Sequence, residues 1–438
     1  MATTYLTRTS WGTATNRQKF TQSFWIKRGV IGVQQALLGV ESGGNNEARV
    51  LFRTDDTLEF YDYQSGYTFR YITNRKFRDC SAWYNIVLRV DTDNGTVANR
   101  VRIYINGVQE TSFSTETQPS RYLNTFYNSS GNHIVQIGRQ STGNSYFNGS
   151  MSHVNFLDGE DRDGSFFGST DATTGEWKIK TTPSGVNYGT NGYFILKNGN
   201  SVTDSSTNSN NFTVGGGTLT KTEDNPSNVF CTWNTNYRGT RKDMTLTNGA
   251  TFIFEQNSGD SSVSGTIAVS GSGKYYWEQR IAQVNGTNAA VAGAMHSTED
   301  WSTTPDEVSG NNNTFGVRSN GNAYKNGTNL GSVTAATYNN DILGIGFDVD
   351  NARVFLWRNG VAQNSGNAII TGIDTSKNWI PFGIQHGGAR VTTSTNFGNG
   401  YFQTTAVSSA GTNASGNGIF EYDVPSGYTA ISTKGLNL

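Results

Sequence analysis

The feature that most constrains the fold is an alternation of apolar and polar residues that runs up to an Asn-Gly pair. Residues 84–91 (YNIVLRVD) and 101–105 (VRIYI) alternate in this way, and Asn106-Gly107 follows directly. A period of two places every second side chain on one face of a β-strand. Asn and Gly both tolerate the positive φ angles of a tight hairpin turn. The stretch therefore predicts a β-hairpin with one face buried in a core.

Similar short runs, separated by Gly, Asn and Asp, recur along the chain. They include residues 20–27, 35–40, 49–53, 57–62, 67–72, 134–138, 149–156, 251–255, 274–280, 314–317, 342–349, 353–357 and 391–397. The chain contains 52 Gly but only 6 Pro, and charged residues make up 15% of it, a composition that favours strands and turns over helices. No run in the first half keeps a helical period. We therefore predict an all-β protein.

The length of 438 residues corresponds to two or three domains. A polar stretch at 198–228 is poor in bulky apolar residues, which is typical of a connector. After it, residues 348–361 repeat the pattern of residues 91–108, with an acidic turn, an alternating strand and Asn-Gly-Val. We therefore predict two consecutive antiparallel β-sandwich domains of the jelly-roll type, at 1–197 and 229–438, joined by the polar connector.

The charge balance and the cysteine count argue against several classes of protein. The net charge is −1, so no overall field attracts nucleic acid or an anionic membrane. No apolar run resembles a transmembrane helix or a signal peptide, and we expect neither membrane insertion nor Sec export. Cys80 and Cys231 lie far apart and predict no disulfide framework. The basic run at 70–78 is interpreted as the solvent face of a strand and its loop, with an anion site as the alternative.

Two sets of short motifs suggest known families. The first set comprises FTQSFWIK (20–27), WYNIVLRV (83–90), RIYINGV (102–108), IGR (137–139) and FNG (147–149). It resembles the concanavalin A-like lectin/glucanase fold of the LamG type. The second set comprises GKYYWE (273–278), ILGIGFDVD (342–350), VFLWRNGV (354–361), WIPF (379–382) and NFG (396–398). It resembles a SPRY domain, which implies a β-sandwich that recognises partners and has no catalysis of its own.

A third set of motifs spans both predicted domains and the connector. It comprises NFLDG (155–159), SFFG (165–168), TDATTGEW (170–177), YGTNGYF (188–194), DSSTNSNNFT (204–213), DNPSNVFC (224–231) and IFEYDVPSGYTAISTKGL (419–436). The set resembles bacteriophage structural proteins, which implies a protein on the virion surface: a tail fibre, a receptor-binding protein or a capsid decoration protein. The implied partners are other virion proteins and a host-surface polysaccharide. The sequence has no heptad or β-helix repeat that would require a homo-oligomer, and assembly as a trimer is left as an alternative.

Catalysis is the main alternative, because some concanavalin A-like folds are glucanases. Retaining glycosidases need two carboxyl groups about 5–5.5 Å apart, which an E-x-D-x-x-E strand supplies, and the sequence has no such run. Two pairs of acidic residues do alternate, Asp91 with Asp93 and Asp348 with Asp350. Each pair precedes an Asn at the end of a strand, where acidic residues favour turns, so we interpret both pairs as turn residues. No Ser-His-Asp set or phosphate loop stands in a suitable context. We predict that the protein is not an enzyme. A polysaccharide depolymerase is the alternative. A third possibility, a cellular adhesin, would need an export signal, and the sequence shows none.

Aromatic residues in polar loops are the candidate ligand contacts. Their rings can stack on sugars while neighbouring amides bind hydroxyl groups. The candidates are Trp301 in HSTEDWSTTPDE, Tyr324 with Asn326 beside Gly327, and Tyr127 in TFYNSSGNH. A loop-anchoring role is the alternative for each ring. We therefore predict lectin-like carbohydrate binding at one or more of these loops.

The densest group of carboxylates lies at Glu160, Asp161 and Asp163, in the stretch EDRD that departs from the bacteriophage-like pattern. Oxygen-rich loops suit Ca²⁺, so these three residues are the candidate metal ligands. The spacing of an EF-hand is missing, and a solvated loop is the simpler interpretation. We expect no other cofactor.

Overall fold

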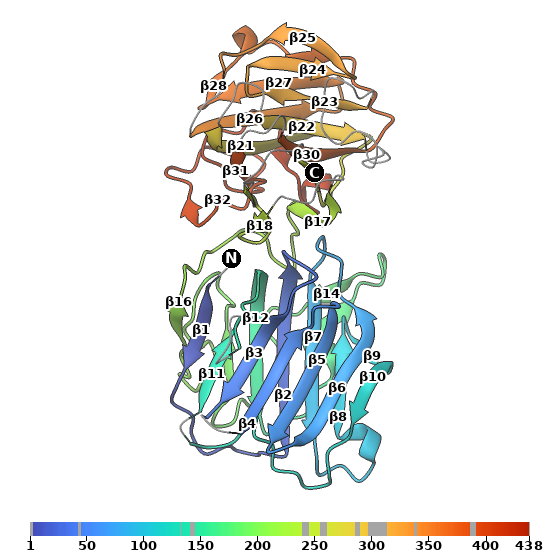
Figure 1. Cartoon of the computed structure of the whole chain (residues 1–438), viewed down its shortest axis with the longest axis vertical. Helices are drawn as coiled ribbons and strands as arrows, with labels where there is room; N and C mark the ends of the chain where they lie inside the picture. The colour runs from blue at the N-terminus through green and yellow to red at the C-terminus, as the bar shows by residue number, and fades with distance from the viewer. Residues whose placement is uncertain are drawn as a thin grey trace. The chain divides into compact units, whose positions relative to one another are not determined.

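The computed structural model describes all of the chain except residues 1–2, 43–44, 132, 141–144, 239–244, 255–260, 285–289, 297–312, 337–339, 386–390 and 438. The chain divides into two compact units, Met1–Lys221 and Thr222–Leu438, both built from β-strands (Figure 1). The only helical elements in the described part are 3₁₀ turns: η1 (Val97–Asn99), η2 (Gly164–Phe166), η3 (Asn364–Gly366) and η4 (Gly435–Asn437). Among the described residues, no helix has the length and apolarity needed to cross a membrane.

The described strands of the first unit form two large antiparallel sheets and a small hairpin. The eight-stranded sheet has the order β10 (Phe113–Thr117), β6 (Tyr67–Lys76), β5 (Thr57–Gln64), β4 (Asn46–Phe52), β3 (Gln35–Glu41), β11 (Ile134–Ile137), β1 (Tyr5–Arg8) and β16 (Thr213–Gly216). The six-stranded sheet has the order β15 (Tyr193–Ile195), β12 (Gly149–Asp158), β2 (Lys19–Arg28), β7 (Tyr84–Asp91), β8 (Val101–Ile105) and β9 (Val108–Glu110). The hairpin pairs β13 (Gly168–Thr170) with β14 (Trp177–Ile179).

The core of the first unit lies between its two large sheets. Phe20, Phe24 and Ile26 alternate along β2 and are fully buried, and they cluster with Val50 and Phe60 from the opposite sheet. The period-two pattern thus places one face of each strand in a shared interior, as the sequence predicts. This arrangement is a β-sandwich.

The second unit has the same architecture. Its seven-stranded sheet, counted over the described residues, has the order β17 (Trp233–Arg238), β20 (Ser261–Gly265), β30 (Trp379–Gln385), β22 (Ala290–His296), β23 (Thr314–Arg318), β24 (Asn322–Lys325) and β25 (Thr328–Ser332). The facing sheet has the order β18 (Thr245–Thr247), β19 (Phe252–Phe254), β31 (Val391–Asn396), β21 (Lys274–Val284), β26 (Asp341–Asp348), β27 (Arg353–Arg358) and β28 (Val361–Ala362). Also paired are β29 (Ile370–Thr371) with β27, β34 (Thr429–Ala430) with β21, and β32 (Tyr401–Phe402) with β33 (Thr405–Ala406).

Buried side chains from both sheets of the second unit meet in one apolar cluster. Val263 and Phe315 come from one sheet, and Trp277, Ile345 and Leu356 come from the other. The prediction of an all-β chain with two antiparallel sandwiches is therefore confirmed. β34 is an exception to the antiparallel pairing, because it joins β21 in parallel.

The Asn-Gly pairs form tight turns in both units. Asn106 and Gly107 have φ values of 49° and 77° between β8 and β9. Asn359 and Gly360 have φ values of 50° and 78° between β27 and β28. Two consecutive positive φ angles define the hairpin turn that this dipeptide favours. The hairpin predictions are confirmed at both places.

The polar stretch at 198–228 is not a free connector. β16, which lies inside it, pairs with β1 at the edge of the eight-stranded sheet. Asp204 Oδ1 accepts hydrogen bonds from the backbone N–H groups of Phe194 and Ser206, each over 2.8 Å. Most of the stretch therefore belongs to the first unit, and the division of the chain falls between Lys221 and Thr222.

The beginning and the end of the second unit lie side by side. The backbone N–H of Cys231 donates to the carbonyl of Ile431 over 2.9 Å. The N–H of Val229 donates to the hydroxyl of Thr433 over 3.0 Å. These contacts hold the two ends of the unit together.

Candidate functional site

The residues that follow β12 cover the outer face of the six-stranded sheet. Val87 of β7 and Tyr104 of β8 alternate with core residues and therefore point away from the core. They pack in a separate apolar cluster with Leu157 of β12 and Phe167, which follows η2. Much of this outer face is thus buried beneath the chain itself.

Polar contacts fix the covering segment at its acidic start. The hydroxyl of Thr21 donates to the carbonyl of Glu160 over 2.8 Å. Asp161 accepts from Arg89 Nε over 3.1 Å, and Lys19 Nζ lies 3.5 Å from its other carboxylate oxygen. The segment therefore begins at a fixed position on β2 and β7.

A polar pocket of about 480 Å³ opens beside this anchored start. Its volume lies within the range of about 300–1,000 Å³ that small-ligand sites occupy in proteins. The lining residues are Asp161, Arg162, Asp163, Ser165, Phe166, Lys180, Thr182, Pro183 and Ser184. Apart from Phe166 and Pro183 these residues are polar or charged, so the pocket suits a ligand that is rich in hydroxyl groups.

Short contacts fix the charged groups of the pocket. Arg162 Nε donates to Glu160 Oε2 over 2.8 Å, and this hydrogen bond raises the pKa of Arg162 above its usual value. The Arg162 guanidinium lies 4.9 Å from the centroid of the Phe166 ring, which is a cation–π distance. Lys180 Nζ donates to the carbonyl of Ser165 over 2.7 Å. These contacts link the charged side chains of the pocket wall to one another and to the backbone.

Asp163 caps the short helical turn that forms part of this wall. Its Oδ1 accepts from the backbone N–H of Ser165 over 2.9 Å and from the Ser165 hydroxyl over 2.6 Å. The residue is exposed, and within the described part of the chain its second carboxylate oxygen has no hydrogen-bond partner. That oxygen can accept a hydrogen bond from a ligand.

The predicted metal ligands do not form a common site. Glu160 pairs with Arg162, Asp161 pairs with basic residues of the sheet, and Asp163 caps its own turn. Across the described residues there is no group of three or more acidic, His or Cys side chains that could hold a metal ion. The expectation of a Ca²⁺ site at these three carboxylates is corrected, because each carboxylate is directed at a different partner.

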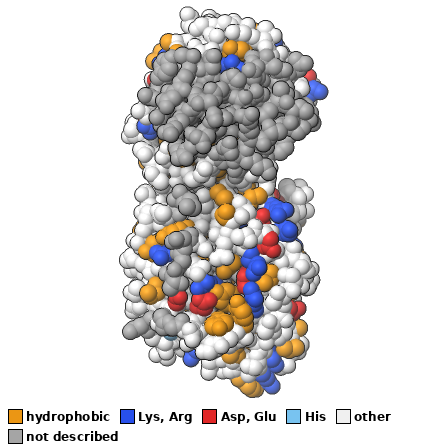
Figure 2. All heavy atoms as spheres, in the orientation of Figure 1, with side chains coloured by type: hydrophobic (Ala, Val, Ile, Leu, Met, Phe, Trp, Pro, Cys, Tyr) orange, Lys and Arg blue, Asp and Glu red, His pale blue; other side chains and the backbone are white. Residues whose placement is uncertain are grey.

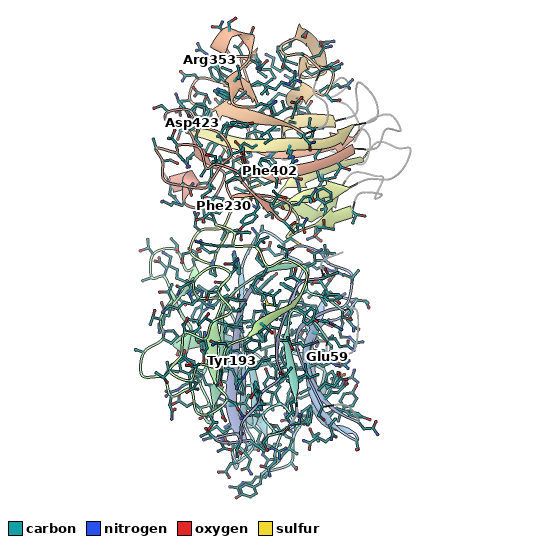
Figure 3. All side chains as sticks on the ribbon, turned by 90° about the vertical axis from the view of Figure 1, so that its left-hand side faces the viewer. Glu59, Tyr193, Phe230, Arg353, Phe402 and Asp423 are labelled. Atoms are coloured by element: carbon teal, nitrogen blue, oxygen red, sulfur yellow. The ribbon has the colours of Figure 1, made fainter. Side chains whose placement is uncertain are left out.

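Tyr127 is a core residue rather than a loop contact. Its side chain is only 1% exposed, its ring stacks on Phe20 at a centroid distance of 4.6 Å, and its hydroxyl donates to Gln22 over 3.2 Å. Burial raises the pKa of Tyr127 well above its usual value. Tyr193 donates to the same Gln22 oxygen over 3.0 Å and lies inside the unit (Figure 3). As folded, Tyr127 offers no ring face to a ligand.

Tyr324 and Asn326 belong to a hairpin. Asn326 and Gly327 have φ values of 48° and 78° and join β24 to β25, so they form the same kind of turn as the other Asn-Gly pairs. The Tyr324 side chain is 5% exposed, and the Arg318 guanidinium lies 4.6 Å from its ring centroid. The expectation of an open loop is wrong here. Trp301 lies outside the described residues.

Asp158, in the motif NFLDG, is a hydrogen-bond centre that no local pattern in the sequence indicates. Asp158 Oδ1 accepts from Asn16 N and Asn128 Nδ2, over 3.1 and 2.7 Å. Its Oδ2 accepts from Thr15 N and Asn191 N, over 2.8 and 3.0 Å. One buried carboxylate therefore joins three other segments of the first unit to β12. The pocket residues Phe166 and Lys180 were also missed, since no local pattern separates them from ordinary surface residues.

The second unit contains a buried carboxylate, Glu278 of β21. Its oxygens accept from the backbone N–H groups of Glu421 and Tyr422, each over 2.9 Å, and from Asn396 Nδ2 over 3.3 Å. The Tyr276 hydroxyl lies 3.4 Å away. Burial raises the pKa of Glu278 to about 7. This carboxylate attaches the C-terminal segment to the outer face of its sheet.

The first unit corresponds to a known class of domain. Residues 2–160 match the family described as Laminin_G_3, of the concanavalin A-like lectin/glucanases superfamily. This part of the chain therefore carries a concanavalin A-like lectin/glucanase-type domain, as the motif resemblance implied. The match ends at Glu160, so all of the residues that line the pocket lie beyond it.

Among solved structures, the chain is similar to the SPRY domain of human HERC1, with a TM-score of 0.32 and 16% identity over 37% of this chain and 96% of that chain. It is similar to the TRIM65 PSpry domain, with a TM-score of 0.28 and 14% identity over 38% of this chain and 91% of that one. It is also similar to stonustoxin, with a TM-score of 0.28 and 15% identity over 37% of this chain and 27% of that one. No curated protein matches the chain.

Proposed function

We propose that this chain is a surface protein of a bacteriophage virion and that its first unit binds a host-surface saccharide in the pocket of residues 161–184. The observation that carries the saccharide part is the pocket itself, which combines a half-buried aromatic ring with hydroxyl, carboxylate and ammonium groups. The concanavalin A-like lectin/glucanase-type domain beside it supports the same ligand class. The bacteriophage-like motifs support the virion part.

The pocket chemistry suits a sugar ring. Phe166 offers an apolar surface to the C–H face of a pyranose, which is the usual contact between aromatic residues and sugars. Asp163 and Lys180 supply a charged acceptor and a charged donor, and Thr182 and Ser184 supply hydroxyl groups at the rim. Arg162 and Lys180 each already form a contact within the protein, which lowers the side-chain entropy that they lose on binding.

A glycan array probed with the purified full chain tests the proposal. We expect binding to a subset of bacterial surface saccharides, and we expect Phe166→Ala to weaken it about tenfold because the stacking contact is lost. Tyr122→Ala is the matched control, since this tyrosine is 54% exposed and does not line the pocket. Unchanged binding by the Phe166 variant, or no binding to any host saccharide, would refute the pocket assignment.

We propose binding without hydrolysis. Two carboxylates, Asp161 and Asp163, line the pocket, but Asp161 forms ion pairs with Arg89 and Lys19, so only Asp163 keeps an open carboxylate oxygen. A glycosidase of the usual kind needs two carboxyl groups, one as the acid and one as the base or nucleophile. The alternative, a polysaccharide depolymerase, predicts release of reducing ends from host envelope polysaccharide and its loss in Asp163→Asn. Absence of any released sugar would support the binding role.

The virion assignment has its own test. In this proposal the chain attaches to other virion structural proteins and has no nucleic-acid or membrane partner. Mass spectrometry of purified particles should find the chain, and an antibody against it should label intact virions. If the chain is found only in the lysate and never on particles, the virion assignment fails while the saccharide proposal stands.

A further inference from the structure

Three hairpins of the chain close with the same two-residue turn (Figure 1). Asn106-Gly107 joins β8 to β9, Asn326-Gly327 joins β24 to β25, and Asn359-Gly360 joins β27 to β28. The Asn φ values are 49°, 48° and 50°, and the Gly φ values are 77°, 78° and 78°. Among the described residues, no other Asn-Gly pair forms a two-residue hairpin. The three turns are therefore matched in sequence and in backbone conformation.

Two of the three Asn side chains are hydrogen-bonded to the neighbouring strand. Asn106 Oδ1 accepts from the backbone N–H of Asn85 over 2.7 Å. Asn359 Oδ1 accepts from the backbone N–H of Ile342 over 2.9 Å, and its Nδ2 donates to Asp341 Oδ1 over 2.7 Å. Neither amide group can turn toward the following glycine unless these hydrogen bonds break.

The third side chain, that of Asn326, differs in this respect. Its backbone N–H donates to the carbonyl of Thr314 on the neighbouring strand over 2.8 Å, as the other two turns do with their own neighbours. The residue is exposed, and within the described part of the chain its amide group forms no hydrogen bond. The Asn326 side chain can therefore change rotamer without losing a contact.

An Asn side chain that can turn toward a following glycine is open to loss of its amide group. Hydroxide removes the proton of the glycine N–H, and the nitrogen attacks the side-chain carbonyl carbon of the Asn. A C–N bond forms, the amide nitrogen takes up a proton from water and leaves as ammonia, and a succinimide ring remains. Water then opens the ring at either carbonyl to give aspartate or isoaspartate. Glycine favours the attack because no side chain shields its nitrogen, and the two reacting atoms must first come into contact.

We propose that Asn326 is a site of spontaneous deamidation in the folded protein, and that hydrogen bonds to the neighbouring strand protect the matched residues Asn106 and Asn359. A protected amide must first give up a hydrogen bond from a backbone N–H, which slows its reaction about tenfold. The backbone angles of the three turns agree within 2°, so the side-chain contacts make the difference. The site belongs to the second unit and does not depend on the proposed saccharide pocket.

Deamidation changes both the charge and the pairing of the β24–β25 hairpin. Isoaspartate lengthens the backbone by one carbon at a turn whose two-residue length sets the register of the strands. Either product adds one negative charge, although residues 326–332 carry no charged side chain. In Figure 2 the end of the second unit that carries β25 is mostly white, with few charged side chains in view. This edge of the sheet therefore acquires a new charge as the protein ages.

Peptide mapping by mass spectrometry tests the proposal on the full chain held at mildly alkaline pH, once in buffer and once in urea. In buffer, Asn326 should lose its amide about tenfold faster than Asn106 and Asn359. In urea the turns are lost, so all three residues should react at similar rates. The rate at Asn326 should rise with pH, because hydroxide starts the reaction.

Two variants separate the side-chain contacts from other effects. Asp341→Ala removes the acceptor of Asn359 Nδ2 and should speed deamidation at Asn359 severalfold while leaving Asn326 unchanged. Arg358→Gln is the matched control, since Arg358 binds the other oxygen of Asp341 and does not contact the Asn359 amide. Equal rates at the three sites in buffer, an intact Asn326 in buffer, or an unchanged Asn359 rate in the Asp341 variant would overturn the proposal.

Discussion

Replacing Glu278 by Gln should remove most of the pH dependence of stability in the second unit. The carboxylate lies buried on β21 and accepts two backbone N–H groups of the C-terminal segment, at Glu421 and Tyr422. Gln has nearly the same shape but only one acceptor oxygen, so one of those donors loses its partner. A buried donor without a partner costs about 1–3 kcal/mol. The variant should therefore be less stable than the wild type near neutral pH.

The size of the pH effect follows from the pKa. Burial raises the pKa of Glu278 from 4.5 to about 7, so the folded state binds this proton more tightly than the unfolded chain. The free energy of unfolding is then greatest below pH 4.5 and decreases as the pH rises toward 7. A shift of about 2.5 pH units corresponds to roughly 3 kcal/mol.

This difference can be measured by urea unfolding of the full chain at pH 5 and pH 8. Hydrogen exchange in peptides from β21 monitors the unfolding of the second unit. The wild type should lose about 2.5 kcal/mol between the two pH values, because the unfolded-state carboxyl is already mostly ionised at pH 5, and Glu278→Gln should lose much less. Other titrating groups are common to both proteins and cancel in the comparison. If the variant keeps the slope of the wild type, Glu278 does not carry the proton, and the reasoning from its burial is wrong.

Three further predictions concern the first unit. Asp56→Asn should destabilise it by about 3–5 kcal/mol in urea unfolding, because fully buried Arg28, whose Nη1 lies 3.0 Å from the Asp56 carboxylate, loses its counter-charge; an effect below 1 kcal/mol would contradict this. Gly107→Ala should lower the melting temperature, since φ is 77° and an added Cβ would lie 2.3 Å from the Trp177 ring. Burial lowers the pKa of His153 to about 4, so stability should rise between pH 4 and 6.5 as the unfolded-state histidine loses its proton; His153→Gln should flatten that rise in calorimetry.

Local chemistry explains what could be predicted from the sequence. Period-two alternation identified most strands, because each strand needs one buried face. The Asn-Gly signal found the turns at Asn106 and Asn359, because both residues of the dipeptide adopt positive φ. An Asn-Gly pair also occurs at Asn326, but the nearby aromatic residue Tyr324 suggested a loop that contacts a ligand. At this position the preference of Asn-Gly for a hairpin turn predicts the structure correctly.

Long-range packing explains what could not be predicted. Tyr127 lies in a polar stretch of sequence that resembles a loop. However, its ring stacks on Phe20 and its hydroxyl binds Gln22, and both residues are more than one hundred positions away in the chain. Asp161 forms its ion pairs with residues 72 and 142 positions earlier in the chain, Arg89 and Lys19. No local pattern reports such partners. The pocket likewise depends on how the segment after β12 folds across a sheet.

The adjacent ends of the second unit make it transferable. The backbone N–H groups of Cys231 and Val229 donate hydrogen bonds to Ile431 and Thr433. The two ends of this sandwich therefore lie at one point. A domain of this kind can be inserted into a surface loop of a host protein without forcing that loop apart. Gene rearrangement could therefore exchange such a unit between otherwise unrelated proteins as a cassette, and a circular permutant joined at this point should keep the same sheets.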